Sequence, residues 1–211
     1  MVLTKKPRQV PLETKLSSLR NMVDAPARHR VHMKEGGLST FLARIDAAEY
    51  GMCRRLNSGA AHSPLRLIFR VASRLGDGVF WYALIIALPL IYGRAAVRPA
   101  VAMALTAIAG VLLYKWLKRT FVRERPFITH SAIDLAAAPL DRYSFPSGHT
   151  LHAVCFTWQT VAHFSELSWI LVPFAGLVAA SRVVLGLHYP SDVLVGALLG
   201  ALLAALGLAF A

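Results

Sequence analysis

Long apolar stretches fill most of the chain after residue 78 and predict helices that cross a membrane. Residues 79–93 carry no charge, and aromatic side chains stand near both ends, as is common at membrane–water interfaces. This stretch is shorter than the roughly 20 residues of a typical span, so we expect it to include part of the preceding helix. Further spans are predicted by their apolar composition at 99–117, 147–164, 167–185 and 190–211. The pattern predicts an all-α membrane bundle of about five transmembrane helices.

Two features of these spans bear on packing and function. Gly196 and Gly200 stand one helical turn apart in the last span, and small residues at this spacing let two helices approach closely. The connections between spans are short, except for residues 118–146 between the second and third spans. A loop that long inside a compact bundle usually has a function.

Two segments before the first span have the spacing of amphipathic helices. In residues 38–57 apolar side chains recur at helical spacing, and charged side chains fill the other faces. A second helix is expected to begin at residues 63–64, with Arg66, Arg70 and Arg74 on one stripe. We expect both helices to lie at the membrane interface. A packed surface helix is the alternative for the first, and a solvated or snorkelling face is the alternative to headgroup binding for the arginine stripe.

The basic residues and prolines of 1–37 predict a disordered basic tail, which precedes a single membrane domain at 38–211. The tail lacks the continuous apolar segment of a secretory signal peptide, and Met33 is an alternative start of the protein. The formal net charge of +12 raises nucleic acid as a partner. However, the tail has no interleaved aromatic residues for base stacking, and hydrophobic residues make up 56 % of the chain. We therefore expect the bilayer and its anionic headgroups as partners, and no nucleic acid.

Ionisable residues near the ends of spans are costly in lipid, and here they form three clusters. The clusters lie at 118–126, 144–150 and 181–192. In the predicted order of spans, the end of the second, the start of the third, the end of the fourth and the start of the fifth all lie at one membrane face. We therefore expect the three clusters to meet on one side of the membrane.

The middle cluster predicts an anion site with a titratable ring. Pro146 stops a helix that arrives from the N-terminal side, and Ser147 is a favourable N-cap for the next helix. Gly148 lets another group approach the backbone closely. His149 then falls in the first helical turn, where free N–H groups and the helix dipole favour an anion. Taken alone, the pattern is a weak signal, because an ordinary capped helix start with a nearby histidine is common.

The outer two clusters supply cations, a second histidine and a carboxylate. Lys118 and Arg125 stand about two helical turns apart, and snorkelling cations at a membrane boundary are the alternative interpretation. Arg182 lies within apolar sequence, which disfavours simple surface solvation. Asp192 follows His188 across a proline, and a carboxylate there can fix the tautomer of the ring and stabilise its cationic form.

Together these residue types fit phosphoryl transfer without a metal. Cations neutralise phosphate oxygens, one histidine attacks, and the other protonates the leaving group. Asp134 and Asp141 are scattered in the long loop and Asp192 is paired with a histidine, so we predict no Mg²⁺ site and no cofactor. Cys53 and Cys155 lack the spacing of a zinc site or a disulfide framework.

The three clusters resemble the signature of the type 2 phosphatidic acid phosphatase superfamily, through the motifs Lys118-x6-Arg125-Pro126, Pro146-Ser147-Gly148-His149 and Ser181-Arg182-x5-His188-x3-Asp192. That superfamily includes lipid phosphate phosphatases, prenyl pyrophosphate phosphatases, glucose-6-phosphatase and vanadium haloperoxidases. The resemblance covers residues 118–192, and every signature position matches.

The resemblance implies a role for each matching residue. His188 would be the nucleophile that forms a phosphohistidine, and Asp192 would orient it and stabilise its charge. His149 would be the general acid for the leaving group and would later activate water. The phosphate oxygens would be bound by the remaining positions, which are Lys118, Arg125, Ser147, the Gly148 backbone N–H and Arg182.

The five-span layout behind an amphipathic helix looks like the bacterial undecaprenyl pyrophosphate phosphatases of this superfamily. Undecaprenyl pyrophosphate is therefore the favoured substrate, followed by phosphatidic acid and phosphatidylglycerol phosphate. Two alternatives remain: a non-enzymatic channel or lipid-binding membrane protein, and a vanadate-dependent haloperoxidase, although haloperoxidases are typically larger and soluble.

The resemblance implies a bacterial inner membrane protein whose active site faces the periplasm or the outside. The positive-inside rule predicts the opposite orientation, because the basic tail and the three clusters fall on the same face. Some of that positive charge belongs to the candidate site, where it reports on chemistry and not on insertion. We therefore favour the outward-facing site.

Overall fold

The computed structural model describes residues 37–60, 64–139 and 141–210. Its contacts divide the chain into Met1–Phe41, of which only the start of one helix is described, and Leu42–Ala211. The predicted basic tail, apart from Gly37, and the alternative start at Met33 lie outside the described residues. All structural features below belong to residues 42–211.

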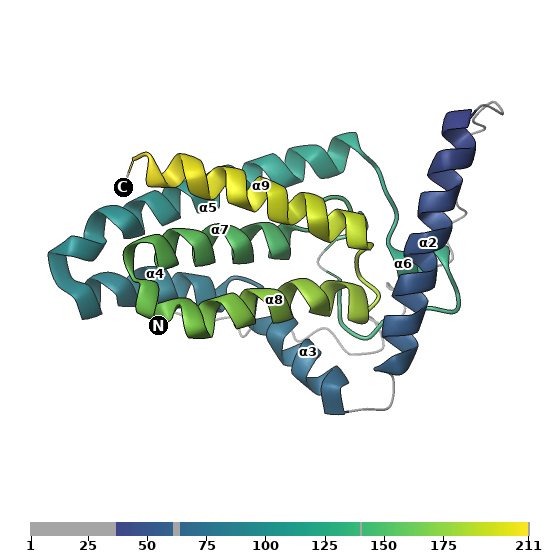
Figure 1. Cartoon of the computed structure of the whole chain (residues 1–211), viewed down its shortest axis with the longest axis horizontal. Helices are drawn as coiled ribbons and strands as arrows, with labels where there is room; N and C mark the ends of the chain where they lie inside the picture. The colour runs from purple at the N-terminus through teal and green to yellow at the C-terminus, as the bar shows by residue number, and fades with distance from the viewer. Residues whose placement is uncertain (1–36, 61–63, 140, 211) are drawn as a thin grey trace, which may run out of the picture. The chain divides into compact units, whose positions relative to one another are not determined.

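Across the described ranges the chain forms helices and no β-sheet (Figure 1). In chain order the helices are α2 (Gly37–Gly59), α3 (Pro64–Leu75), α4 (Val79–Tyr92), η1 (Gly93–Ala96), α5 (Val97–Thr120), α6 (Pro126–Thr129), α7 (Gly148–His163), η2 (Ser165–Leu167), α8 (Ser168–Val184) and α9 (Pro190–Leu208). Both predicted amphipathic segments are helical, and the long loop between the second and third spans contains only the short helix α6.

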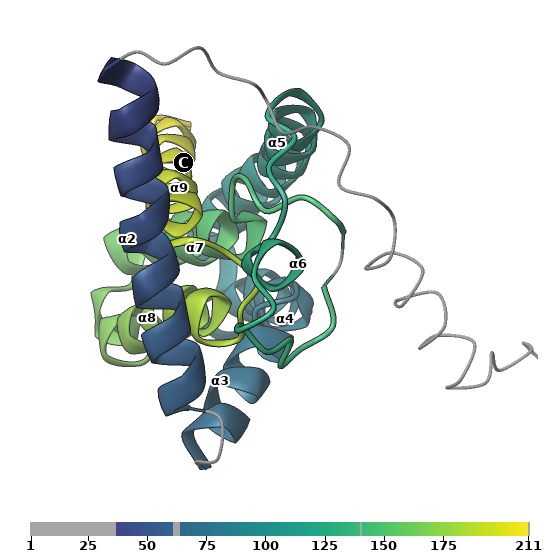
Figure 2. The ribbon, with the colours of Figure 1, turned by 90° about the vertical axis from the view of Figure 1, so that its right-hand side faces the viewer.

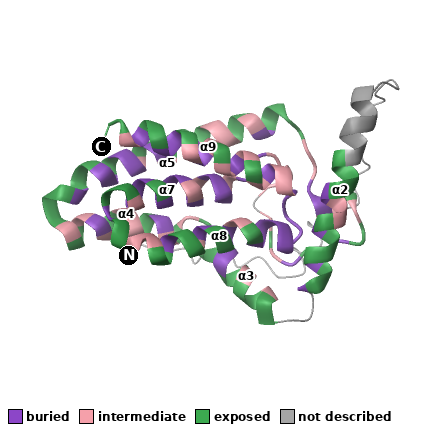
Figure 3. Ribbon diagram, viewed as in Figure 1, coloured by how far each residue is buried: buried purple, intermediate pink, exposed green. Residues whose placement is uncertain are grey.

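Helix α7 lies at the centre of the bundle, between α5, α8 and α9 (Figures 1 and 2). Figure 3 shows that it is mostly buried, and its Leu151 and Phe156 join Trp81 of α4 and Met103 of α5 in the main apolar core. The outward faces of α4, α5, α8 and α9 carry exposed apolar side chains, such as Leu198 with 61 % of its surface exposed. An apolar outer surface around a closed set of helices is the arrangement that lipid requires.

Three stretches of the described residues are long and apolar enough to cross a membrane: Val79–Thr120, Ser165–Val184 and Pro190–Leu208. The first of them contains two helices, α4 and α5, joined by η1. Helix α7 has 16 residues and is covered by its neighbours on several sides. Helices therefore occupy each position at which a span is predicted, and the protein is an all-α membrane helix bundle.

Two glycines of α9 let it pack directly on the backbone of α7. A Cβ atom at Gly196 would lie 2.5 Å from the carbonyl oxygen of Ser147, and one at Gly200 would overlap the carbonyl oxygen of Leu151. This confirms the close helix contact predicted from the spacing of the two glycines. The contact also sets the register of the site, because the Ser147 N–H donates to the Asp192 carbonyl at 3.0 Å.

Helix α2 buries a mixed face that includes Glu49, Cys53 and Asn57, and exposes several of its apolar side chains. Glu49 and Asn57 are 7 % and 2 % exposed, whereas Met52 and Leu56 are 51 % and 44 % exposed. An apolar stripe that points away from the protein favours a membrane-interface helix over a packed surface helix. The buried face instead contacts the first charged cluster, the third charged cluster and the long loop.

The long loop is tied to the helices that precede the bundle. Asn57 of α2 donates from Nδ2 to the carbonyl oxygens of Asp134 and Val184, both at 3.0 Å, and its Oδ1 accepts from the Asp134 N–H. Arg70 of α3 donates from Nε to the Ala136 carbonyl at 3.0 Å. At least part of the arginine stripe on α3 therefore holds the loop.

Candidate active site

A cavity of about 490 Å³ joins the three charged clusters to the apolar interior of the bundle. Five of the predicted site residues line it, namely Lys118, Arg125, Gly148, His149 and His188. The rest of its wall is largely apolar and comes from α4 and α5, for example from Ile85 and Val111. The three other predicted residues are buried, with exposures of 0 % for Ser147, 2 % for Arg182 and 0 % for Asp192.

Lys118 and Arg125 meet through the carboxylate of Asp141, which lies in the long loop. Lys118 Nζ contacts both carboxylate oxygens at 2.9 Å, and Arg125 donates from Nη2 to Oδ1 at 2.8 Å. Helix α5 ends at Thr120, so the two cations do not share a helix face and are brought together by the loop. Burial raises the pKa of Asp141, but Lys118 and Arg125 outweigh it and hold that pKa below its usual value. The carboxylate thus occupies hydrogen-bond donors of both cations.

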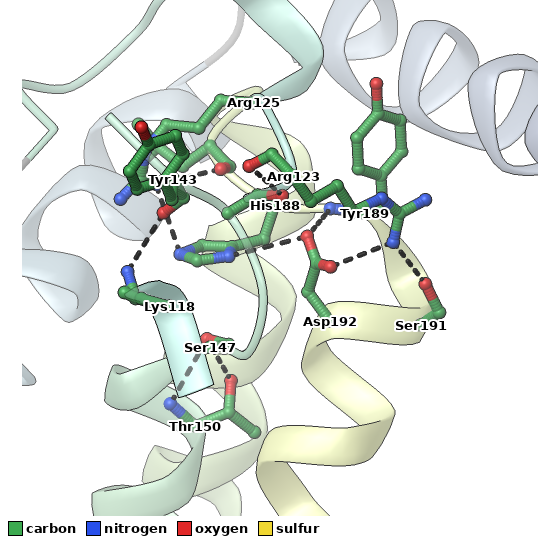
Figure 4. Close-up of polar contacts among 12 residues, drawn as sticks. Lys118, Arg123, Arg125, Tyr143, Ser147, Thr150, His188, Tyr189, Ser191 and Asp192 are labelled. Carbon is green, nitrogen blue, oxygen red and sulfur yellow. Dashed lines mark hydrogen bonds and ion pairs between the residues drawn. The ribbon is translucent and has the colours of Figure 1, made fainter. Parts of the chain in front are cut away.

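His188 lines the cavity and lies between a cation and a carboxylate, as Figure 4 shows for its neighbours Arg125 and Asp192. Its Nε2 is 3.2 Å from Arg125 Nη1, and its Nδ1 is 3.6 Å from Asp192 Oδ2. Burial, together with the positive charges of Arg125, Arg182 and Lys118, places the pKa of His188 well below its ordinary value. The imidazole is therefore neutral at pH 7. A proton on Nδ1, facing the carboxylate, leaves the Nε2 lone pair to accept a hydrogen bond from Arg125 Nη1.

Asp192 is held on both of its carboxylate oxygens. Oδ2 accepts from the Tyr189 N–H at 2.8 Å, as part of the capping box that begins α9 after Tyr189. Oδ1 accepts from Arg123 Nη1 at 2.9 Å. Arg123 falls between the signature positions of the first cluster, and no pattern in the sequence assigns it a separate role.

His149 is paired with Asp77, which lies between α3 and α4. The hydrogen bond joins His149 Nε2 to Asp77 Oδ1. Because a carboxylate only accepts, Nε2 carries the proton that a general acid would donate. Burial raises the pKa of Asp77, but the hydrogen bond from His149 and the nearby charges of His149 and Arg182 keep it below its usual value. An Asp between two glycines, Gly76 and Gly78, was the only signal in the sequence for this partner.

The remaining predicted residues occupy supporting positions. Arg182 donates from Nη1 to the Ser73 hydroxyl, and its buried Nε has no partner among residues 37–60, 64–139 and 141–210. Ser147 is the N-cap of α7 and its hydroxyl contacts Thr150 Oγ1 at 2.9 Å, so that hydroxyl points away from the cavity. Gly148 packs against the ring of Tyr114, which a Cβ atom would approach to 3.3 Å.

The described part of the chain contains no group of three or more His, Cys, Asp or Glu side chains that could hold a metal ion. Cys53 and Cys155 are separate, buried free thiols. What the site offers chemically is a neutral imidazole, a second imidazole that carries a proton on Nε2, and three buried cations, two of which line the cavity. That set can bind, attack and protonate a phosphate ester.

Comparison with known proteins agrees with this chemistry. An undecaprenyl-diphosphatase of Bacillus subtilis, BcrC, is 34 % identical over 114 residues, which cover 54 % of this chain and 58 % of that protein. An undecaprenyl-diphosphatase of Sulfolobus acidocaldarius is 32 % identical over 130 residues, covering 61 % of this chain and 62 % of that protein. The matches thus span about three fifths of the length of these curated relatives.

Solved structures extend the likeness to nearly the whole chain. The transmembrane PAP2 type phosphatidylglycerolphosphate phosphatase of Bacillus subtilis superposes with a TM-score of 0.65 at 25 % identity, and the match covers 94 % of each chain. The model of the PAP2 superfamily matches residues 95–211, which include all three charged clusters. The protein belongs to the PAP2 superfamily.

Proposed function

We propose that the protein is an integral membrane phosphatase that hydrolyses a lipid phosphate or lipid diphosphate. One observation carries the proposal: a single cavity has both histidines and two cations at one end and apolar walls from α4 and α5 along the other. A phosphorylated lipid has the same two-part chemistry, with an anionic headgroup and a long apolar chain. The relatives named as lipid phosphatases support the same conclusion.

In the proposed reaction, His188 Nε2 attacks the phosphorus atom and forms a phosphohistidine. The P–O bond to the leaving group breaks, and His149, in its imidazolium form, transfers its Nε2 proton to the departing oxygen and becomes neutral. Lys118, Arg125 and Arg182 neutralise the phosphate oxygens, and the substrate phosphate displaces the Asp141 carboxylate from the first two. Water then attacks the phosphohistidine with His149 as the base, which releases inorganic phosphate and restores both rings.

Undecaprenyl diphosphate is the favoured substrate, and phosphatidic acid and phosphatidylglycerol phosphate follow. The apolar wall of the cavity supports a lipid that enters from the side of the bundle, with its headgroup at the level of the charged clusters. We place the protein in a bacterial cytoplasmic membrane with the site on the outer side. The predicted tail at 1–37 and membrane domain at 38–211 belong to the same proposal.

The first test measures phosphate release by the detergent-purified protein from undecaprenyl diphosphate, phosphatidic acid and phosphatidylglycerol phosphate. We expect hydrolysis that vanadate inhibits, since vanadate resembles the transferring phosphoryl group, and that EDTA leaves unchanged. A folded protein that releases no phosphate from any of the three would favour the non-enzymatic alternative. Activity that EDTA removes and Mg²⁺ restores would contradict the two-histidine mechanism.

A second test narrows the apolar part of the cavity. Ala104→Phe places a ring in the α5 wall, and displacing two methylenes of lipid costs about 1.6 kcal/mol, or roughly tenfold in kcat/KM. We expect that loss for the long-chain lipid and unchanged hydrolysis of a short, water-soluble phosphate ester. The matched control is Ala109→Phe, because Ala109 lies on the exposed face of the same helix. Equal losses for both substrates in Ala104→Phe would show that the apolar wall does not bind the lipid chain.

A further inference from the structure

Behind His188, on the side away from the cavity, lies a chain of charges that reaches helix α2. Glu49 is the α2 member, and its carboxylate accepts two hydrogen bonds. Oε2 accepts from Arg123 Nη2 at 2.6 Å, and Oε1 accepts from the Ser191 N–H at 2.7 Å. Burial raises the pKa of Glu49, but these two hydrogen bonds and the charge of Arg123 hold it below its ordinary value. Glu49 is therefore ionised at pH 7.

Arg123 bridges Glu49 to the carboxylate that faces His188. Its Nη1 donates to Asp192 Oδ1 at 2.9 Å and to the Ser191 hydroxyl at 2.7 Å, as Figure 4 shows. The guanidinium carbon lies 4.0 Å from the centre of the Tyr189 ring. Contacts on several sides leave the guanidinium little freedom. Arg123 does not line the cavity, so a direct role on the substrate phosphate is disfavoured.

The side chains of Glu49, Arg123 and Asp192 together carry a net charge of −1. Arg123 alone would cancel the carboxylate of Asp192, which is fully buried. With Glu49 included, two carboxylates share one guanidinium, and the group as a whole presents a net charge of −1 towards His188. A negative charge there stabilises the cationic ring that forms when His188 attacks phosphorus.

We propose that Glu49 and Arg123 are positioning residues, which hold Asp192 against His188 and set the net charge behind the nucleophile. This inference rests on the phosphatase function proposed above. It also gives helix α2 a part in the chemistry, although α2 lies outside the residues that match the family model. Neither residue touches the reacting atoms, and each acts through Asp192.

Many charges surround His188, and most of them are positive. The groups that face it or its carboxylate partner are Glu49 and Cys53 of α2, Lys118 of α5, Arg123 and Arg125 before α6, Asp141 of the long loop, His149 of α7, Arg182 of α8 and Asp192 of α9. Because cations dominate, the negative pair of Glu49 and Asp192 is the main opposing charge on the far side of the ring.

Opposite changes of charge should move the pH profile in opposite directions. His188 must be neutral to attack, so activity falls as the pH drops through its pKa. Glu49→Gln removes a negative charge and lowers that pKa, so the acidic limb of kcat moves to lower pH by about one unit. Arg123→Gln removes a positive charge, raises the pKa, and moves the limb to higher pH. The double variant should return towards the wild-type position, because the two charges cancel.

The size of kcat supplies a second readout. In Glu49→Gln, the charge of Arg123 cancels that of Asp192, and no net negative charge remains behind His188. The cationic ring is then stabilised less in the transition state, so we expect kcat to fall about tenfold with KM unchanged. Glu49→Asp and Arg123→Lys keep the charges and should retain the wild-type pH profile. The matched control is Asp46→Asn on the same helix, because Asp46 lies 3.5 Å from Arg123 but has 73 % of its side chain exposed. Solvent screens that pair, so neither kcat nor the profile should change.

The measurements are pH–rate profiles of detergent-purified variants, with thermal stability recorded in parallel. The inference is wrong if Glu49→Gln and Arg123→Gln lose activity only in proportion to lost folded protein, with unmoved pH profiles. It is also wrong if the acidic limb of kcat shifts in the same direction in Glu49→Gln and in Arg123→Gln. A folded wild-type protein that releases no phosphate from any lipid would instead refute the proposed function, and this inference with it. If either Gln variant does not fold, the variants Arg123→Lys and Glu49→Asp still test the inference. Both keep the charge at their position, so both should retain the wild-type pH profile.

Discussion

His188→Asn should abolish the covalent step and lower kcat by about 10⁴-fold. The replacement keeps a polar group of similar size in a position that is 1 % exposed, so the fold is expected to survive. It removes the only imidazole nitrogen in the described chain that lies next to Arg125 with a carboxylate at its back. Rapid acid quenching with radiolabelled substrate should trap a phosphoenzyme in the wild type and none in the variant.

The matched control is His163→Asn, since His163 lies exposed at the end of α7 and has no contact with the cavity. It should retain wild-type turnover. A different assignment of roles would be visible in the same experiment. If His188→Asn still accumulates phosphoenzyme and His149→Asn does not, His149 is the nucleophile and the proposed order of the two histidines is reversed.

Gly200→Val should prevent α9 from packing on α7 and destabilise the protein by about 3 kcal/mol or more. The added side chain meets the Leu151 carbonyl, which belongs to the backbone of a buried helix and cannot rotate away. The two helices would have to separate, and Ser147 and Asp192 are hydrogen-bonded across the same pair. We expect loss of folded protein and of activity together.

Fluorescence-detected gel filtration after heating in detergent measures this effect. The control is Gly176→Val in α8, because a Cβ atom at Gly176 meets nothing within 4 Å. Both variants add the same β-branched side chain to a helix, so any difference in melting temperature reports the helix contact alone. Equal melting temperatures for the two variants would refute a tight contact between α7 and α9.

The sequence predicted the elements of this fold well, because each span carries its own signal. Apolar runs bounded by charges locate the helices, and the order of spans brings the charged ends to one side without any knowledge of side-chain contacts. The Gly196 and Gly200 spacing predicted a helix contact for the same reason, since a small-residue stripe is a local pattern. In each case, neighbouring residues along the chain contained the information.

The partners of the site residues could not be predicted in this way. Asp77 and Asp141 reach His149 and Lys118 from an interhelical turn and from an irregular loop, where no periodicity links the partners. In the sequence Asp141 is an isolated acidic residue of the long loop, although in the structure it joins the two cations of the first cluster. Helix α2 shows the same limit: its apolar spacing predicted a helix, but Met52 and Leu56 are exposed while Glu49 and Asn57 are buried.

Several of these partners precede residue 95, where the match to the superfamily model begins. Glu49, Asn57, Ser73 and Asp77 all come from α2, α3 and the turn that follows, and they contact Arg123, the long loop, Arg182 and His149. The matched half of the chain thus brings the reacting groups together with Asp141 and Asp192, and the preceding segment adds Glu49, Asp77 and the hydrogen bonds of Asn57 and Ser73. A fragment limited to the matched residues would carry the complete signature motif and still lack half of its electrostatic frame.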